Sequence, residues 1–163
     1  MIDTGVTLYV GGACYYRQID SLAMSLCVAE VITNEHWDEY VMAGYQLARK
    51  MGQPPQVSMA AFTHGFPSAY QRGKLATHLK KFGVPPLLRV AVLTDSALIR
   101  GAMTAFGWIM PSTTLRAFEV LDISGCLKWL QQAAPFDEVK AASAWAEGRR
   151  ILGLDHGRAK RTE

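Results

Sequence analysis

The chain has 163 residues, of which half are apolar and 19% are charged, and its formal net charge is +3. This is the composition of one folded domain with a sizeable core, and no apolar run approaches the roughly 18 residues of a membrane span. Five basic residues from Arg149 onward, against two acidic ones, account for the whole excess charge, so the near-neutral body does not favour nucleic-acid binding.

Cysteine usage and the first residues indicate the compartment. The three cysteines, Cys14, Cys27 and Cys126, are an odd number without a C-x-x-C motif, which is typical of reduced, buried thiols. The first residues carry no positive charge, so no signal peptide is expected. We therefore predict a cytoplasmic protein.

The first third of the chain reads as strands. Residues 6–10 end at a Gly11-Gly12 turn, and residues 14–19 end at Asp20-Ser21. Residues 22–29 then alternate between larger apolar side chains and small ones, which predicts a half-buried strand. Because the connections are short, we expect these strands to form an antiparallel meander.

Two helices and a strand are predicted next. Asn34 is expected to cap a helix that ends before Gly52 and Pro54; its apolar face is Trp37, Val41, Gly44, Ala48 and Met51. Residues 57–62 read as a buried strand and residues 63–68 as a loop. A second helix runs to about Phe82, and its predicted inner face is Leu75, Ala76, Leu79 and Phe82.

The stretch 88–130 fixes the fold class. Two β-branched apolar runs, 89–93 and 115–120, each precede a helical segment, and strand-helix-strand order requires a parallel pair with a right-handed crossover. The helix between them starts at Asp95 or Ser96 and ends at Gly107; its predicted face is Ile99, Ala102, Met103 and Phe106. A short helix follows Asp122.

A fifth helix is expected from Asp137, with Val139, Ala142, Trp145 and Ala146 as its packing side. Residues 154–163 are polar and basic and are expected to fray. We therefore predict a single α/β domain over residues 1–153. Its sheet is mixed and mostly parallel, with N-terminal antiparallel strands, and its helices pack on one side.

Three motifs carry a resemblance to a known family. They are the strand-loop 59–66, the strand 89–95 (R-V-A-V-L-T-D), and the closing unit 115–118 with C-L-K-W-L at 126–130. Residues 57–130 resemble the SpoIIAA-like family, within the STAS/SEC14-type group of small α/β domains. The resemblance implies a four- to five-stranded sheet and does not imply an enzyme; residues 6–19 and 137–152 extend the common core.

The resemblance draws attention to Ser68. In the anti-sigma-factor antagonists of the STAS group, a phosphorylated Ser lies at the helix N-terminus after the second parallel strand, where free N–H groups favour a phosphate. Here Pro67-Ser68-Ala69 occupies that region without the acidic signature. Ser68 is thus either a phosphorylation site or a plain N-cap.

Five polar side chains follow the ends of two predicted parallel strands, where open α/β sheets place ligands; they are Thr63, His64, Ser68, Asp95 and Ser96. A His near an Asp and a Ser suggests nucleophilic catalysis, although no G-x-S-x-G surrounds either Ser. The alternative is a loop His beside ordinary helix caps. No metal-ligand spacing and no glycine-rich nucleotide motif occurs, so no metal and no cofactor is predicted.

Three functions follow in order of preference. The first is a non-enzymatic regulatory or protein-binding module of STAS type, acting on a protein partner or as a homodimer. The second is a binder of a small apolar ligand or lipid of the SEC14 kind, in a cleft between the sheet and the apolar helices. The third is a hydrolase that uses His64 with Ser68 or Ser96. A pocket of a few hundred Å³ favours the ligand binder, and an exposed aromatic or apolar patch favours the partner module.

Overall fold

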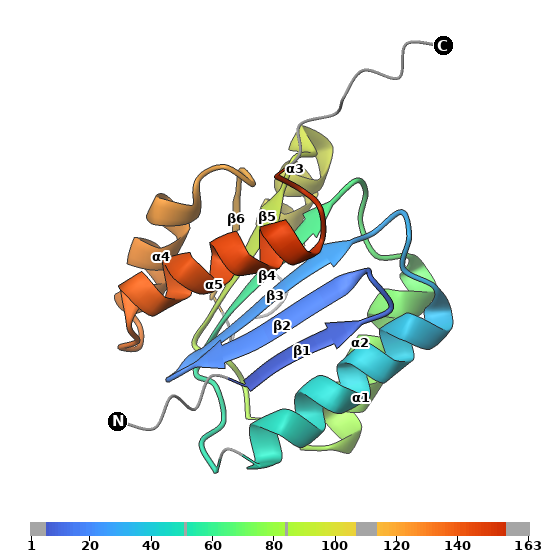
Figure 1. Ribbon diagram of the computed structural model, residues 1–163, viewed down its shortest axis with the longest axis horizontal. Helices are drawn as coiled ribbons and strands as arrows, with labels where there is room; N and C mark the ends of the chain where they lie inside the picture. The colour runs from blue at the N-terminus through green and yellow to red at the C-terminus, as the bar shows by residue number, and fades with distance from the viewer. Residues whose placement is uncertain (1–5, 51, 84, 107–113, 156–163) are drawn as a thin grey trace.

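A computed structural model describes residues 6–50, 52–83, 85–106 and 114–155. Its strands are β1 (Val6–Val10), β2 (Cys14–Ile19), β3 (Leu22–Val28), β4 (Val57–Thr63), β5 (Arg89–Thr94) and β6 (Thr114–Phe118). Its helices are α1 (Asn34–Lys50), α2 (Ala69–Lys81), α3 (Ala97–Phe106), α4 (Ile123–Gln131) and α5 (Glu138–Ile151). Figure 1 shows the arrangement.

The six strands form one sheet in the order β1-β2-β3-β4-β5-β6. The pairs β1–β2 and β2–β3 are antiparallel, and the pairs β3–β4, β4–β5 and β5–β6 are parallel. The predicted fold class, α/β with N-terminal antiparallel strands and a mostly parallel sheet, is therefore confirmed. Each parallel strand lies beside its predecessor, so the crossover connections all advance in one direction.

The helices cover both faces of the sheet, whereas we expected them on one side. Crossovers that advance in one direction with one handedness place their helices on one face, and this face carries α1, α2 and α3. After β6 the chain passes to the opposite face, where α4 and α5 pack (Figure 1). The two faces accordingly bury two separate apolar clusters.

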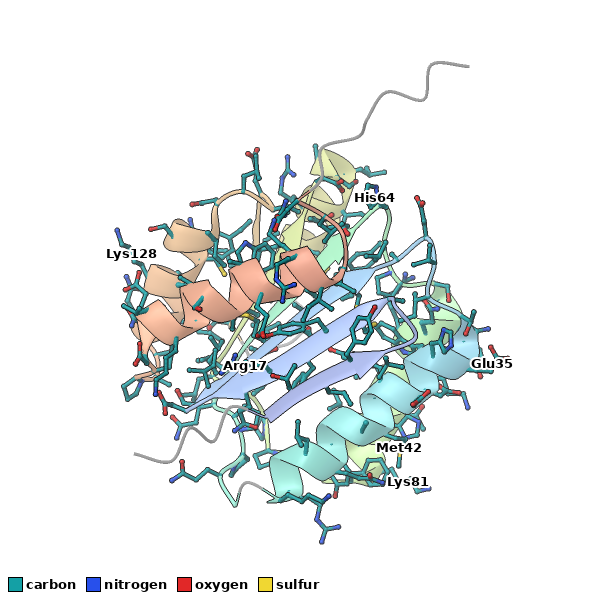
Figure 2. All side chains as sticks on the ribbon, viewed as in Figure 1. Arg17, Glu35, Met42, His64, Lys81 and Lys128 are labelled. Carbon is teal, nitrogen blue, oxygen red and sulfur yellow. The ribbon has the colours of Figure 1, made fainter. Side chains whose placement is uncertain are left out.

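The larger cluster lies beneath α4 and α5. Large side chains of the three central strands meet the helices there, including Leu22, Met24 and Met59, which are fully buried. Tyr15 adds its ring to this core and donates from its hydroxyl to Glu147 of α5 at 2.8 Å. Glu147 also pairs with Arg17 at 3.1 Å, between α5 and β2 (Figure 2).

Helix cover on both sides explains one wrong prediction. Every residue of β3 is buried, although its alternation indicated a strand with one solvated face. The alternation is real, but it separates large side chains on the α4–α5 face from small ones, Ala23, Ser25 and Cys27, on the α1–α2 face. Both faces lie under helices.

The packing faces of three helices differ from prediction. On α5 the buried residues are Ala141, Ala144, Trp145 and Gly148, so Trp145 was predicted correctly, but Val139, Ala142 and Ala146 are exposed. On α2, Ala76 and Leu79 are exposed. Of the predicted face of α3, Ile99 and Met103 are half-buried, whereas Ala102, Phe106 and the predicted end at Gly107 lie outside what the structure describes.

The helix starts were predicted more closely. Asp122 and Asp137 cap α4 and α5, accepting from the backbone N–H groups of Gly125 and Lys140. At α1 the capping oxygen belongs to Thr33, which accepts from the N–H of His36 at 3.1 Å, and not to Asn34. A cap one residue earlier is an ordinary error of sequence-based boundaries.

Beyond α5 the chain folds back onto the end of the helix as far as residue 155. The N–H of Leu154 donates to the carbonyl of Arg149, whose side chain pairs with Asp155 at 3.0 Å. The expected fraying therefore does not begin at residue 154, and residues 156–163 lie outside the described ranges. No helix within those ranges is long and apolar enough to cross a membrane.

Candidate ligand-binding site

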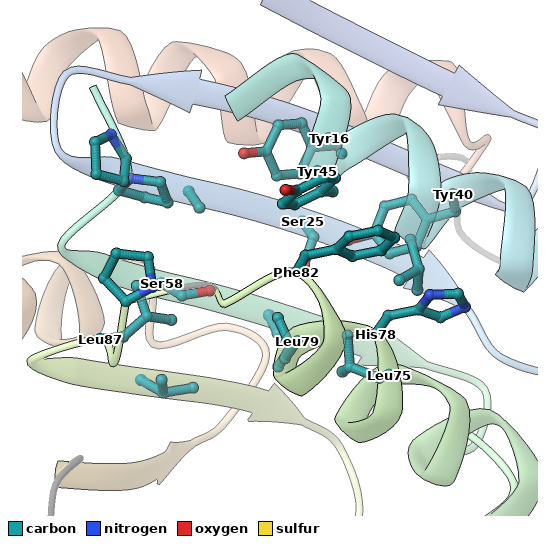
Figure 3. A pocket seen from close by; sticks show the side chains of 18 of the residues that line it. Tyr16, Ser25, Tyr40, Tyr45, Ser58, Leu75, His78, Leu79, Phe82 and Leu87 are labelled. Carbon is teal, nitrogen blue, oxygen red and sulfur yellow. The ribbon is translucent and has the colours of Figure 1, made fainter. Parts of the chain in front are cut away.

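A cavity of about 550 Å³ lies between α1, α2 and the face of the sheet that they cover (Figure 3). The sheet forms its floor, α1 and α2 form its walls, and the loops after the two helices border it at one end. The lining is mostly apolar and aromatic, and includes Trp37, Val41 and Phe62.

Small side chains on the two central strands make the hollow. On the α1–α2 face, β3 presents Ala23 and Ser25, and β4 presents Ser58 and Ala60. The opposite face of the same strands carries Leu22, Leu26, Val57 and Met59, which fill the space under α4 and α5. Helices pack at a distance set by the largest contacts, so small floor residues beneath α1 and α2 leave a cavity.

Two contacts hold α1 and α2 apart at fixed spacing. Near the start of both helices, the indole N–H of Trp37 donates to the carbonyl of Gln71 at 2.8 Å. Towards their ends, the rings of Tyr45 and Phe82 stack with centroids 4.1 Å apart. The cavity lies between these two interhelical contacts, and Tyr45 and Phe82 themselves line it.

Hydroxyl groups supply most of the polarity within the cavity. Tyr40 hydrogen bonds to Ser25, and burial raises the pKa of the Tyr40 hydroxyl well above its ordinary value. Burial also raises the pKa of Tyr16 to about 12. Both phenols are therefore protonated at neutral pH and available as hydrogen-bond donors.

One lining polar atom, Nδ1 of His78, is buried without a hydrogen-bond partner among the described residues. The hydroxyl-bearing side chain of Tyr16 also lines the cavity. A buried polar atom without a partner costs free energy unless something else binds it. A ligand oxygen or a water molecule can satisfy Nδ1 of His78.

A pair of buried cysteine thiols lies under α1, beside the cavity. Cys14 and Cys27 are both buried, and Cys27 contacts Tyr40. Burial, together with the neighbouring Cys14, raises the pKa of the Cys27 thiol well above its ordinary value. Thiols of this kind are poor nucleophiles at neutral pH, so the dithiol gives the cavity no reactive group.

The five residues predicted to border a cleft lie at or after the carboxyl ends of the adjacent strands β4 and β5, outside this cavity. None of them lines the cavity, and His64 lies at the end of the molecule opposite to Lys81 (Figure 2). Thr63 is buried, whereas His64 is exposed with a φ of 56°. Ligand crevices form where the strand order reverses, and the order of this sheet does not reverse at β4 or β5.

Both candidate serines act as helix caps. Ser68 forms a capping box with Gln71, accepting from its N–H at 3.2 Å while the Gln71 side chain accepts from the N–H of Ser68 at 2.9 Å. Ser96 accepts from the N–H of Ile99 at 3.3 Å. Neither serine is hydrogen-bonded to His64 or Asp95, all four lying within the described ranges.

The aromatic side chains are shared between core and cavity. Tyr15, Trp37 and Trp145 are core residues. Tyr16, Tyr40 and Tyr45 line the cavity. Tyr9 is half exposed, and Trp108 lies outside the described residues.

Comparison of the chain with protein-family models, with curated proteins and with solved structures found no match in any of the three. The resemblance of residues 57–130 to the SpoIIAA-like family therefore stays a prediction from its motifs. Within the described ranges, no group of three or more His, Cys, Asp or Glu side chains is placed to hold a metal ion.

Proposed function

We propose that this protein binds a small, mainly apolar ligand in the cavity between α1, α2 and the sheet, without transforming it. The observation that carries the proposal is the cavity itself, whose 550 Å³ falls within the range of small-molecule sites. At about 30 Å³ per non-hydrogen atom, it accommodates a ligand of roughly 18 such atoms.

The distribution of polar groups supports a bound ligand. Binding sites combine an apolar lining with a few polar groups that fix orientation. His78 fits that role because its buried Nδ1 has no partner among the described residues, and Tyr16 brings a protonated hydroxyl to the lining. A ligand oxygen near Tyr16 would accept a hydrogen bond from its protonated hydroxyl.

The test uses the neutral dye N-phenyl-1-naphthylamine, which is small enough for this volume, and a variant that fills the cavity. Ala60 lines the cavity on β4, and Ala60→Leu places three further carbon atoms inside it. Ala142→Leu is the control, since Ala142 is exposed on α5. We expect saturable dye binding that is lost in Ala60→Leu and kept in Ala142→Leu. Dye binding of equal strength in both variants would refute a site in this cavity.

A regulatory, protein-binding module of STAS type is the second candidate. Leu98 and Leu121 are each 84% exposed, and they follow the carboxyl ends of the neighbouring strands β5 and β6. Exposed apolar side chains at adjacent strand ends favour a partner or a homodimer there. The test is native mass spectrometry of the wild type and of Leu121→Asp. A monomer in both would count against the homodimer.

A further inference from the structure

Charge is segregated along the body of the chain, although its sum is near zero. No acidic residue occurs between Glu39 and Asp95, and seven Lys and Arg residues occur there. This segment includes residues 40–50 of α1 and all of β4 and α2, whereas the acidic residues of α1, Glu35, Asp38 and Glu39, precede it. The C-terminal part of α1 and all of α2, which wall the cavity, therefore belong to the basic part of the body.

The cavity opens where these two helices end. Its lining residues are exposed around the end of α1, at Arg49, Gly52 and Pro54, and around the end of α2, at Leu79, Gly83 and Pro85. At the other end, its lining residues Trp37, Val41 and Phe62 are buried. Since α1 and α2 both precede a parallel strand of the same sheet, their C-terminal ends lie at one edge. That edge is the mouth.

Two cations lie against the aromatic pair at the mouth. The Arg49 guanidinium is 6.0 Å from the centroid of the Tyr45 ring, and the Lys81 ammonium is 5.8 Å from that of Phe82. Neither cation pairs with a carboxylate within the described residues. Basic residues in a last helical turn are favoured by the helix dipole alone, but here they also flank the rings that line the cavity.

Given the ligand-binding function proposed above, we infer that the ligand is an anionic single-chain amphiphile. Its apolar chain fills the cavity towards Trp37, and its anionic head lies at the mouth between Arg49 and Lys81. The apolar inner end and the cationic mouth set this orientation. Ser58, close to the mouth on β4, supplies a further hydrogen-bond donor.

The experiment compares myristate with tetradecan-1-ol, which have the same chain length and differ in the charge of the head. We expect the wild type to prefer myristate by about tenfold, the scale of two partly exposed ion pairs. The double variant Arg49→Gln/Lys81→Gln should lose this preference and still bind the alcohol. Added salt should weaken only the binding of myristate by the wild type.

The control is Lys128→Gln/Lys140→Gln, which removes the same charge from exposed residues of α4 and α5. If this control lost the preference for myristate to the same extent, the inference would be overturned, because the effect would then come from net charge. Equal binding of acid and alcohol by the wild type would also overturn it, while leaving the proposed function intact. Binding of neither probe would refute both.

An anionic membrane surface is the other source of the same head-group chemistry. Cosedimentation with phosphatidylglycerol vesicles, set against phosphatidylcholine vesicles, separates the two sources. Vesicle binding that requires Arg49 and Lys81, without binding of free myristate, would overturn the inference of a single-chain ligand. Binding of free myristate without vesicle binding supports it.

Discussion

Cys14 and Cys27 face each other directly across β2 and β3, and their sulfur atoms lie 2.8 Å apart. The carbonyl of Ala13 accepts from the N–H of Val28, so the cysteines occupy the adjacent, non-hydrogen-bonded position of the ladder. At such positions Cα atoms are about 4.5 Å apart, which a disulfide can span.

Oxidation is therefore expected to be selective. With diamide, the number of thiols that react with maleimide after denaturation should fall from three to one, leaving Cys126 free. The rate should rise with pH, because the raised pKa of Cys27 makes its thiolate scarce at neutral pH. Peptide mapping identifies the pair, and a disulfide to Cys126 would contradict the expectation.

Neighbouring alanines on β4 should respond oppositely to the same substitution. Ala60 borders the cavity, so Ala60→Leu should leave the free energy of unfolding unchanged or raise it. Ala61 is fully buried on the α4–α5 face, so Ala61→Leu should destabilise the fold by about 1–3 kcal/mol through overpacking. Urea denaturation of both variants measures the difference. A similar decrease in the free energy of unfolding in both variants would mean that the cavity has no room for the larger side chain at residue 60.

Two helical glycines should also differ. A Cβ on Gly148 would lie 2.7 Å from the Tyr15 ring, whereas one on Gly73 would meet nothing within 4 Å. Gly73→Ala should stabilise the protein by up to about 1 kcal/mol, the helix-propensity difference. Gly148→Ala should lower the melting temperature, because Tyr15 is locked by the core and by Glu147. A higher melting temperature in both variants would show that α5 can move away from β2.

Stability should fall in alkaline solution. The pKa of Tyr16 is about 12 in the folded protein against 10.0 ordinarily, so from pH 10 to 12 only the unfolded chain releases this proton. The protonated Tyr16 hydroxyl therefore contributes about 2–3 kcal/mol to the free energy of unfolding. This contribution is fully present below pH 10 and is lost as the pH approaches 12. Tyr16→Phe should show a shallower decline between pH 9 and 11 in urea denaturation. Parallel profiles for the two proteins would contradict the burial of this hydroxyl.

The sequence predicted the elements well because their signals are local. Capping side chains such as Asp122 and Asp137, glycine and proline stops, and β-branched runs each act within a few residues. The packing side of α5 could not be predicted in this way. Val139 is one of the few large apolar residues of α5 and is 80% exposed. The buried side combines Trp145 with the small residues Ala141, Ala144 and Gly148, which let the helix approach Tyr15.

A cleft between the sheet and the apolar helices was expected for the second function, but the strand residues that line the cavity were missed for a related reason. Small residues in alternate positions of β3 and β4 have the same pattern as a strand with one solvated face, and only the position of α1 and α2 distinguishes the two. A signal was nevertheless present. Ala23 and Ser25 on one strand recur as Ser58 and Ala60 on the next, and neither pair carries the charges usual on a solvated face. The cluster at Ser68 and Ser96 was predicted from strand ends, without knowledge of the strand order.

Each strand pairs with its neighbour in sequence, so the sheet can assemble progressively as the chain leaves the ribosome. The face beneath α5 is the exception, because β2 and β3 must wait for a helix more than a hundred residues later in the chain. Until then Leu22 and Met24 remain uncovered. Nascent chains that stop before residue 138 should therefore be the species that aggregates or recruits chaperones.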